Sequence, residues 1–376
     1  MLAQPPLWLI VLAFISSIGV LVFVHEMGHY LVGRWCGIGA KTFSIGFGRE
    51  IAGWTDRRGT RWKVGWLPLG GYVRFEGDMD PASMGRNLDK LSPEVRAISF
   101  HAKPVWQRFL VVLAGPFANF LLAVLIFAGF FLAFGAPRTP PVVAMVAPQS
   151  AAAAAGLRPG DRIVEMDGRE IATFAELGQY TVMRPGEQVI VRLQRASEML
   201  DVPVTLGVAR EVDRFGQVYR IGRLGVGMPP PVYEKVGLFQ SIPEGIRATW
   251  QTTRSMAEGL WQLITGRRPL NELHGAMKMA QIAGQYASVG PFEFIQLLAL
   301  FSINLGFINL LPVPMLDGGH LALYTVEALR RRPLGEQAQE WVFRGGIAAL
   351  LTLFVFTTFN DLGSFGLWEQ IGRLAG

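Results

Sequence analysis

Four long stretches without a charged side chain constrain this chain more than any other feature of its sequence. They cover residues 1–24, 109–137, 294–316 and 345–360. About 20 consecutive apolar residues let a helix cross the hydrocarbon core of a bilayer. Of the 376 residues, 51 % are hydrophobic and only 17 % are charged, which is too apolar for an ordinary soluble domain. We therefore expect a multi-pass α-helical membrane protein with four transmembrane helices.

The first of these stretches lacks the features of a cleaved secretory signal. No basic residue precedes its apolar run, and no small-x-small site precedes the polar residues that follow. We therefore expect a retained helix at the start of the chain.

Basic residues gather in two of the segments between the apolar stretches. One segment contains an Arg-Arg pair at 57–58, and the other contains three consecutive arginines at 330–332. The positive-inside rule places both segments in the cytoplasm. Both termini then lie outside, as does the long segment between the second and third apolar stretches. These loops account for the formal net charge of +6, which therefore does not indicate nucleic-acid binding. The single cysteine, Cys36, excludes a disulfide framework.

The expected organisation follows from the spans and their connections. It is a first transmembrane helix at 1–33, a cytoplasmic loop with membrane-associated β-structure at 34–105, a second transmembrane helix at 106–137, a β-rich external domain at 140–230, an external amphipathic helical segment at 231–292, a third transmembrane helix at 293–320, a cytoplasmic loop at 321–343 and a fourth transmembrane helix at 344–368.

The three polar segments have different patterns. Residues 60–78 alternate like strands but are interrupted by proline and glycine, which favours a short sheet with an open edge. In the external domain we expect a short helix ending at Gly156, a turn at Pro159-Gly160, a strand at 162–166, a hairpin turn at Asp167-Gly168 and strands at 187–195 and 201–208. Farther on, apolar residues recur at helical spacing between Ile246 and Ile264. This amphipathic helix lies on the bilayer or packs on the external domain, with a direct substrate role as the alternative.

A His-Glu-x-x-His motif closes the first apolar stretch. On a helix, His25 and His29 share one face, so both imidazoles can bind one metal ion while Glu26 lies beside it. Ionisable groups inside a bilayer are costly and are functional by default. A purely structural pairing of the three side chains is the alternative.

A catalytic zinc ion needs a third protein ligand and an open position for water. The strongest candidate is Asp317, the only carboxylate in the third span, and His320 is its rival. Two prolines break that span, and irregular backbone at membrane depth is tolerated where it lines a cavity. We expect His101 in the basic cytoplasmic loop near the membrane surface, and His274 outside, too far from the motif along the membrane normal. Asp317 and the motif both lie at the cytoplasmic end of their spans, so they can meet.

This ligand set indicates hydrolysis. Zinc lowers the pKa of bound water toward about 7 and polarises a carbonyl group. Glu26 can accept a proton from the water and pass it to a leaving amine. The residues therefore indicate peptide hydrolysis inside the membrane, with one Zn²⁺ per chain.

In these motifs the sequence resembles the site-2 protease family of intramembrane zinc metalloproteases, and within it the bacterial regulator-of-sigma-E protease branch, here with a single PDZ domain. The resemblance covers essentially the whole chain. The matching motifs are HEMGH (25–29), LPLGGYVRF (67–75), AGPFANF (114–120), NLLPVPMLDGGH (309–320) and FNDL (359–362).

The resemblance implies roles for individual residues. It implies zinc on His25, His29 and Asp317, Glu26 as the catalytic base and Asn309 as a group that holds the substrate backbone. It also implies that a β-structure at about 62–75 holds an unwound substrate by strand addition, with Gly70, Gly71 and Tyr72 as candidate contacts. Ordinary turn glycines are the alternative at positions 70 and 71.

The external domain resembles a PDZ domain. Its candidate carboxylate-binding loop lies within 221–228 and contains Gly222, Leu224, Gly225 and Val226. The domain then either binds peptide C-termini or excludes substrates with large external parts. The chain departs from the branch in two respects. It has one PDZ unit where some members carry two, and it has ELHGAMKMA (272–280) where the branch tends to have Gly-Gly-Pro.

The resulting hypothesis is an intramembrane protease of the bacterial inner membrane, with its PDZ domain and both termini in the periplasm and its active site toward the cytoplasm. The expected substrates are single-span proteins already trimmed outside, such as anti-sigma factors, with signal-peptide remnants as a second class. A non-catalytic PDZ adaptor is the main alternative, and the intact Glu26 argues against it. A metal transporter and a prenyl-protein-type membrane zincin are further alternatives, disfavoured by the few polar residues in the spans and the lack of a glutamate ligand downstream.

Overall fold

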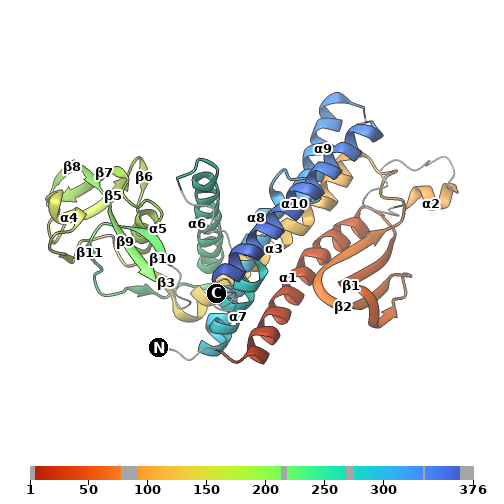
Figure 1. Ribbon diagram of the computed structural model, residues 1–376, viewed down its shortest axis with the longest axis horizontal. Coiled ribbons are helices and arrows are strands. Elements are labelled where there is room, and N and C mark those ends of the chain that lie inside the picture. Colours follow the sequence, from red (N-terminus) through yellow and green to blue (C-terminus); the bar gives the residue numbers. More distant parts are fainter. Residues whose placement is uncertain (1–4, 78–91, 213–217, 268–274, 333–334, 365–376) are drawn as a thin grey trace, which may run out of the picture. The chain divides into compact units, whose positions relative to one another are not determined.

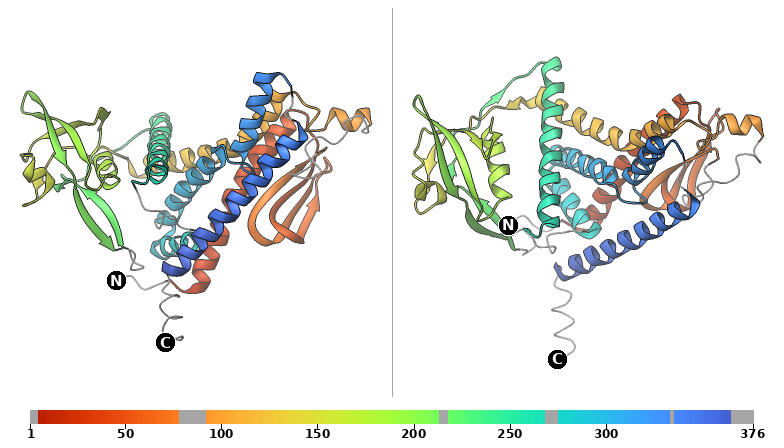
Figure 2. Two further views of the ribbon diagram at one scale, coloured as in Figure 1. Left: turned by 45° about the horizontal axis from the view of Figure 1, so that its top comes forward. Right: turned by 90° about the horizontal axis from the view of Figure 1, so that it is seen from above.

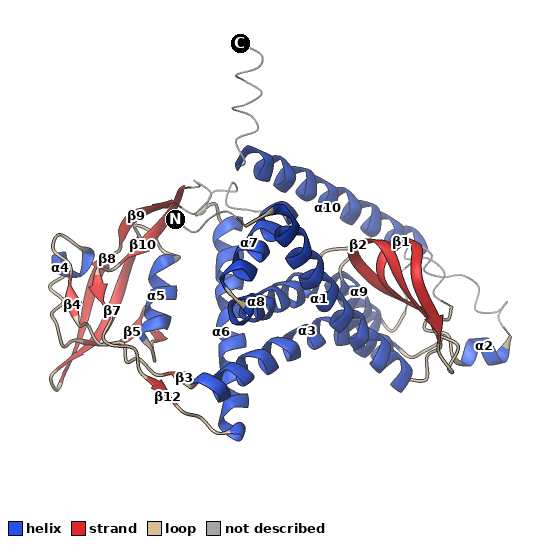
Figure 3. Ribbon diagram, turned by 90° about the horizontal axis from the view of Figure 1, so that it is seen from below, coloured by secondary structure: helices blue, strands red, loops and turns tan. Residues whose placement is uncertain are grey.

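The computed structural model describes residues 5–77, 92–212, 218–267, 275–332 and 335–364 (Figure 1). The chain divides into two compact units. The helical unit comprises residues 1–127, 245–253 and 273–361, and the β-rich unit comprises residues 128–244, 254–272 and 362–376. Figure 3 shows the described strands gathered in two groups, β1–β2 and β3–β12, with most of the helices outside them. Each unit is described by itself.

Within the described residues, four helices are long and apolar enough to cross a membrane. They are α1 (Leu7–Trp35), α3 (Val105–Phe134), α8 (Pro291–Leu310) and α10 (Glu336–Ser364). In the most apolar window of α10 only 6 % of the residues are buried within the protein, as expected of a helix whose side chains face lipid. The prediction of four helices long and apolar enough to span a membrane is confirmed.

Small residues let the helices of the helical unit approach closely. A Cβ atom at Gly28 of α1 would lie 2.2 Å from the Ala114 carbonyl oxygen of α3. One at Gly306 of α8 would lie 3.1 Å from the Pro116 carbonyl oxygen of α3. Close backbone approach through small residues is typical of helices that pack in membranes. It brings α1, α3 and α8 together, as Figure 1 shows.

A curved two-stranded sheet lies against α1 in the same unit (Figure 1). Strands β1 (Ala40–Thr55) and β2 (Arg61–Phe75) are long enough to fold back on themselves, so residues 42–45 pair with 71–74 on one side and with 61–64 on the other. Positive φ angles at Gly46, Gly48 and Gly70 accompany the bends. The segment 71–75 therefore lies at an edge of the sheet. The sequence predicted only the β2 half, because glycines obscure the alternation in β1.

The third transmembrane helix, predicted over residues 293–320, is shorter in the structure, and the break predicted from its two prolines is confirmed. Helix α8 ends at Leu310, and a new helix, α9 (Asp317–Arg330), begins at Asp317. Pro312 and Pro314 lie in the connection, where proline cannot continue a helix. Helix α9 also fills much of the segment 321–343, which was predicted as a loop.

The segment predicted as amphipathic contains two helices rather than one. Helix α6 (Leu238–Ile264) includes all the apolar positions that recur at helical spacing. Helix α7 (Ala276–Val289) is a separate element that packs against α1 and α8, with Gly284 placed so that a Cβ would lie 2.6 Å from Ile10. The Asp361 carboxylate of α10 accepts hydrogen bonds from the backbone N–H groups of Gly275 and Lys278 at the start of α7.

The β-rich unit is built around a four-stranded antiparallel sheet in the order β6-β5-β7-β8 (Figure 2). Its core contains Ile163, Val191 and Leu193, each fully buried. Additional antiparallel pairs are β10–β9, β11–β4 and β12–β3. The remaining bounds are β3 (Ala136–Pro137), β4 (Met145–Val146), α4 (Ala151–Ala154), β5 (Arg162–Met166), β6 (Arg169–Glu170), α5 (Phe174–Val182), β7 (Gln188–Arg195), β8 (Glu198–Thr205), β9 (Gly207–Val212), β10 (Val218–Arg223), β11 (Val226–Gly227) and β12 (Tyr233–Glu234), with α2 (Pro93–Ala97) in the helical unit.

The local predictions in this unit are largely confirmed. Strand β5 has the predicted bounds, and Asp167 and Gly168 both have the positive φ that their hairpin turn requires. The predicted strand at 201–208 is instead shared between the end of β8 and the start of β9. The assignment of this unit as a PDZ domain stays a prediction.

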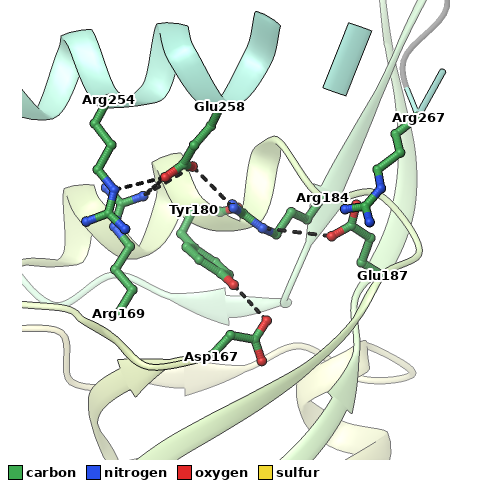
Figure 4. Close-up of polar contacts among 8 residues, drawn as sticks. All are labelled: Asp167, Arg169, Tyr180, Arg184, Glu187, Arg254, Glu258 and Arg267. Atoms are coloured by element: carbon green, nitrogen blue, oxygen red, sulfur yellow. Dashed lines mark hydrogen bonds and ion pairs between the residues drawn. The ribbon is translucent and has the colours of Figure 1, made fainter. Parts of the chain in front are cut away.

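Ion pairs connect the end of α6 to this sheet. The Glu258 carboxylate of α6 accepts from Arg169, 3.0 Å away, and from Arg184, 3.2 Å away. Arg184 also lies over the Tyr180 ring, 3.8 Å from its centroid. Arg254 of α6 itself also donates to Glu258. Figure 4 shows the three arginine side chains, Arg169, Arg184 and Arg254, converging on this carboxylate.

Candidate metal centre

Two imidazoles and one carboxylate converge beside α1. His25 and His29 lie one turn apart on α1, and Asp317 is the first residue of α9. The distance between the two Nε2 atoms is 3.2 Å, and Asp317 Oδ2 lies 3.1 Å from His25 Nε2 and 3.5 Å from His29 Nε2. The three side chains are 11 %, 12 % and 18 % exposed. Among the described residues they form the one His/Cys/Asp/Glu group suited to a metal ion.

The spacing of these atoms fits a tetrahedral zinc ion. Zinc binds nitrogen and carboxylate oxygen at about 2.0–2.2 Å, so the ligand atoms of a regular tetrahedron lie about 3.3–3.6 Å apart. The observed separations run from 3.1 to 3.5 Å. Asp317 Oδ2 is also buried without a hydrogen bond of acceptable geometry, although buried carboxylate oxygens ordinarily have such a partner. An unpaired oxygen that faces two imidazole nitrogens suits a cation between them.

Helix α3 fixes the orientation of both histidines. His29 Nδ1 lies 2.8 Å from the Val111 carbonyl oxygen, which can only accept, so His29 donates from Nδ1 and keeps the lone pair of Nε2 free for a metal ion. The side chain of Asn119 lies 3.0 Å from His25 Nδ1. A Cβ at Gly115 would lie 2.3 Å from His29 Nε2, so glycine makes room for the ring.

These contributions of α3 were missed in the sequence. One signal for them is present, because Asn119 is the only polar side chain in the stretch 109–137. A backbone carbonyl such as that of Val111 gives no such signal.

Glu26 lies on α1 beside strand β2. A Cβ at Gly71 would lie 3.3 Å from Glu26 Cγ and 2.6 Å from Val22 Cγ1, so glycine lets the strand lie against this part of the helix. The backbone of Val73 hydrogen-bonds to the Glu26 carboxylate. The candidate base therefore lies between the metal-binding group and the edge segment 71–75.

The other substrate-binding candidates lie on two elements. Gly70, Gly71 and Tyr72 belong to β2, where Tyr72 stacks on Phe47 with ring centroids 6.0 Å apart. The positive φ of Gly70 supports a conformational role for that glycine. Asn309 is in the last turn of α8, just before the break that leads to Asp317.

Of the other histidines, the two that the structure describes, His101 and His320, are not part of the group. His320 is one turn after Asp317 on α9, and its ring lies 6.4 Å from that of Tyr324. Burial and the Arg108 guanidinium lower the pKa of His101, which precedes α3. His274 lies outside the described residues.

The proposed carboxylate-binding loop of the β-rich unit takes part in internal contacts. Leu224 is 3 % exposed and belongs to the core, and its carbonyl accepts from the Ala152 N–H. Gly225 has a φ of 82°, and its carbonyl accepts from the Ala147 N–H. Gly222 is in β10, and Val226 pairs with Val146. Peptide binding by these four residues stays a prediction.

Comparison with known proteins leads to the same chemistry. The model of peptidase family M50 matches residues 13–353. A protein of Agrobacterium fabrum, provisionally named zinc metalloprotease Atu1380, is 44 % identical over 360 residues, which cover 94 % of this chain and 96 % of that protein. Metalloprotease MmpA of Caulobacter vibrioides is 36 % identical over 391 residues, covering 97 % and 98 % of the two chains.

Proposed function

The chain belongs to peptidase family M50, and from this membership we propose that it is a zinc-dependent endopeptidase that cleaves peptide bonds within or next to the transmembrane segments of single-span proteins. The observation that carries the proposal is the convergence of His25, His29 and Asp317 at one end of a membrane-spanning helix, with Glu26 beside them.

Each group at the site has a distinct role in this proposal. His25, His29 and Asp317 would hold one zinc ion, which when bound supplies Lewis acidity and an activated water. Glu26 accepts the proton of the attacking water and delivers it to the leaving amine. Glu26 lies on the α1 face next to β2, which supports a proton transfer beside the strand edge proposed to receive the substrate.

The open edge of the sheet suits an unwound substrate. A helical segment hides its peptide bonds, and it must become extended before a water can reach them. The segment 71–75 pairs with β1 on one side only, so its other side can add a substrate strand through main-chain hydrogen bonds. Asn309 offers an amide that can pair with backbone groups freed by unwinding. Gly70, Gly71 and Tyr72 would contact the same substrate backbone.

The substrates are proposed from the family resemblance. We expect single-span proteins that have already been trimmed outside, anti-sigma factors first and signal-peptide remnants second. The protein would lie in the bacterial inner membrane, with the β-rich unit in the periplasm and the metal centre toward the cytoplasm. The β-rich unit would then recruit substrate C-termini or exclude bulky external domains.

The test is cleavage of a model single-span substrate by the full chain in detergent, with the zinc content measured on each protein. Glu26→Gln should retain zinc and lose cleavage, because it removes the base and leaves the ligands. Asp317→Asn should lose both, because it removes a charged ligand. The variant His320→Gln is the control, and it should retain zinc because His320 is outside the group.

The outcomes separate the alternatives. Zinc retention without cleavage of any substrate by the wild-type protein would favour the non-catalytic adaptor. Failure of the wild-type protein to hold zinc would overturn the metal centre itself. Loss of zinc in His320→Gln would mean that the ligand set is wrongly assigned.

A further inference from the structure

A buried asparagine on α3 contacts His25 at Nδ1, the ring nitrogen that does not face His29 and Asp317. Asn119 is fully buried, and its side chain lies 3.0 Å from Nδ1 of His25. Its backbone carbonyl accepts from the Ser302 hydroxyl of α8, 2.7 Å away, which fixes the backbone at this position. The atom of the amide nearest to His25 is Nδ2, and Oδ1 is buried without a hydrogen-bond partner.

The two orientations of this amide have opposite consequences for His25. If Nδ2 donates to Nδ1, then the neutral ring must carry its proton on Nε2, the nitrogen that faces His29 and Asp317. A protonated Nε2 cannot bind a metal ion. If the amide is turned by 180°, Oδ1 accepts from Nδ1–H, and the lone pair of Nε2 is free. The turn also gives the unpaired Oδ1 a donor.

His29 shows the second arrangement, with its proton on Nδ1. It donates from Nδ1 to the Val111 carbonyl, which has no alternative role. A site in which both Nε2 atoms face one ion needs the same arrangement at His25. The two second contacts come from α3 at positions 111 and 119, eight residues apart on one helix.

We propose that Asn119 is a positioning residue for the metal centre, in which its side-chain oxygen accepts from His25 Nδ1–H and holds the His25 Nε2 lone pair toward the zinc ion. This inference rests on the zinc-binding part of the proposed function. Asn119 acts through His25 and does not contact the substrate.

The test compares two replacements of Asn119 that differ in their ability to accept a hydrogen bond. Leucine has a similar size and no acceptor, whereas aspartate can accept only, and its charge is compensated when zinc is bound. Zinc affinity is measured for the full chain in detergent by competition with a chelator. Asn119→Leu should bind zinc roughly 10–100-fold more weakly, and Asn119→Asp should remain within about threefold of the wild type.

Ser302→Ala is the matched control. It removes the hydrogen bond to the Asn119 backbone and leaves the amide side chain in place, so zinc affinity should stay close to that of the wild type. The thermal unfolding of the zinc-free proteins shows whether each variant has folded. Equal affinity in Asn119→Leu and the wild type would overturn the proposal, as would an equal loss in the two Asn119 variants with folding intact.

A measurement on the wild-type protein covers the case in which Asn119→Leu does not fold. In zinc-loaded wild-type protein labelled with ¹⁵N-histidine, Nδ1 of His25 should have the chemical shift of a protonated ring nitrogen. Its signal is assigned by its change in Asn119→Asp. An unprotonated Nδ1 overturns the proposal. If the wild type binds no zinc, the proposed function fails. If the wild type and the Asn119 variants bind zinc equally well, only the inference about Asn119 fails.

Discussion

At the scale of single residues, the candidate metal centre depends on a glycine, which has no side chain. Gly115 of α3 faces the His29 ring, and a Cβ there would lie 2.3 Å from Nε2 and 2.5 Å from Cε1. Atoms cannot approach so closely, so either the ring or the helix must move. Because the ring nitrogen is a candidate ligand, a methyl group at this position acts directly on the site.

We predict that Gly115→Ala lowers zinc affinity by at least tenfold, because the His29 ring must leave its position and lose the bond to Val111. Gly129→Ala is the control on the same helix, since nothing lies within 4 Å of a Cβ there. Chelator competition on both proteins checks the prediction. Equal affinity in the two variants would show that the ring tolerates the methyl group.

A buried carboxylate in the β-rich unit provides a pH test. Asp161 is 1 % exposed, and Arg195 donates to it from Nε and Nη2, 2.8 and 2.7 Å away. Hydrogen bonding to Arg195 holds the pKa of Asp161 below its usual range. The unfolded chain therefore takes up this proton at a higher pH than the folded chain. The stability contributed by the pair is complete above the ordinary pKa of about 4 and is lost as the pH falls through the lower folded pKa.

We predict that Asp161→Asn lowers the stability of this unit near pH 6 by about 1–3 kcal/mol. Between pH 6 and pH 3 the variant should lose less stability than the wild type. Hydrogen exchange of the β7 amides, corrected for the intrinsic pH dependence of exchange, measures both effects. Asp201→Asn is the control, because Asp201 pairs with Arg192 at the exposed surface and such pairs contribute little. A larger effect at Asp201 than at Asp161 would contradict the argument from burial.

At the scale of elements, the last turns of α6 are joined to the rest of the β-rich unit by ion pairs that centre on Glu258. Glu258 accepts from Arg169 and Arg184, which are only 10 % and 15 % exposed, and from Arg254 in its own helix. Two apolar side chains near the end of α6, Trp261 and Ile264, are 61 % and 69 % exposed. The ion pairs therefore contribute to holding this end of the helix, while these two apolar side chains are left uncovered.

We predict that Glu258→Ala speeds hydrogen exchange in residues 254–264 by roughly tenfold, because two partly buried guanidinium groups lose their shared acceptor. Arg254→Ala is the control, since it removes only the exposed pair within α6, whose contribution is a few tenths of a kcal/mol. Matching exchange rates in the two variants would mean that α6 is held in another way.

At the scale of the whole molecule, the metal-binding group joins elements that are far apart in the sequence. His25 and His29 come from α1, whereas Asp317 comes from α9, almost 300 residues later. A zinc ion that binds only the folded chain would stabilise it by about 4 kcal/mol when free zinc is a thousandfold above its dissociation constant.

We predict that removing zinc with a chelator lowers the unfolding temperature of the wild-type protein in detergent, and that returning zinc restores it. Asp317→Asn should show neither change, because it lacks the third ligand. Tryptophan fluorescence during heating measures the transition. A chelator effect of equal size in Asp317→Asn would show that the stabilising zinc binds elsewhere.

The parts of this molecule that sequence predicted are those with local signals. Charge-free stretches mark the four spans, and the His-Glu-x-x-His spacing marks one face of α1. The assembly of these elements has no such signal. Strand β1 depends on pairing with β2, and α7 contains the buried Lys278 in a weakly apolar sequence. Two prolines marked the break after α8, but nothing local marked the new helix that begins at Asp317. The structure brings the three predicted ligands together, and their role as zinc ligands stays a prediction.

The two histidines differ in their vulnerability to genetic change. The partner of His29 is the main-chain carbonyl of residue 111, and no substitution at that position removes a carbonyl from the chain. The partner of His25 is the side chain of Asn119, which a single codon change can replace. His29 is therefore held by the main chain, which substitutions leave in place, whereas His25 is held by a side chain that a mutation can remove. A search for weakened natural or laboratory variants is best directed at position 119, where a substitution leaves every candidate metal ligand intact.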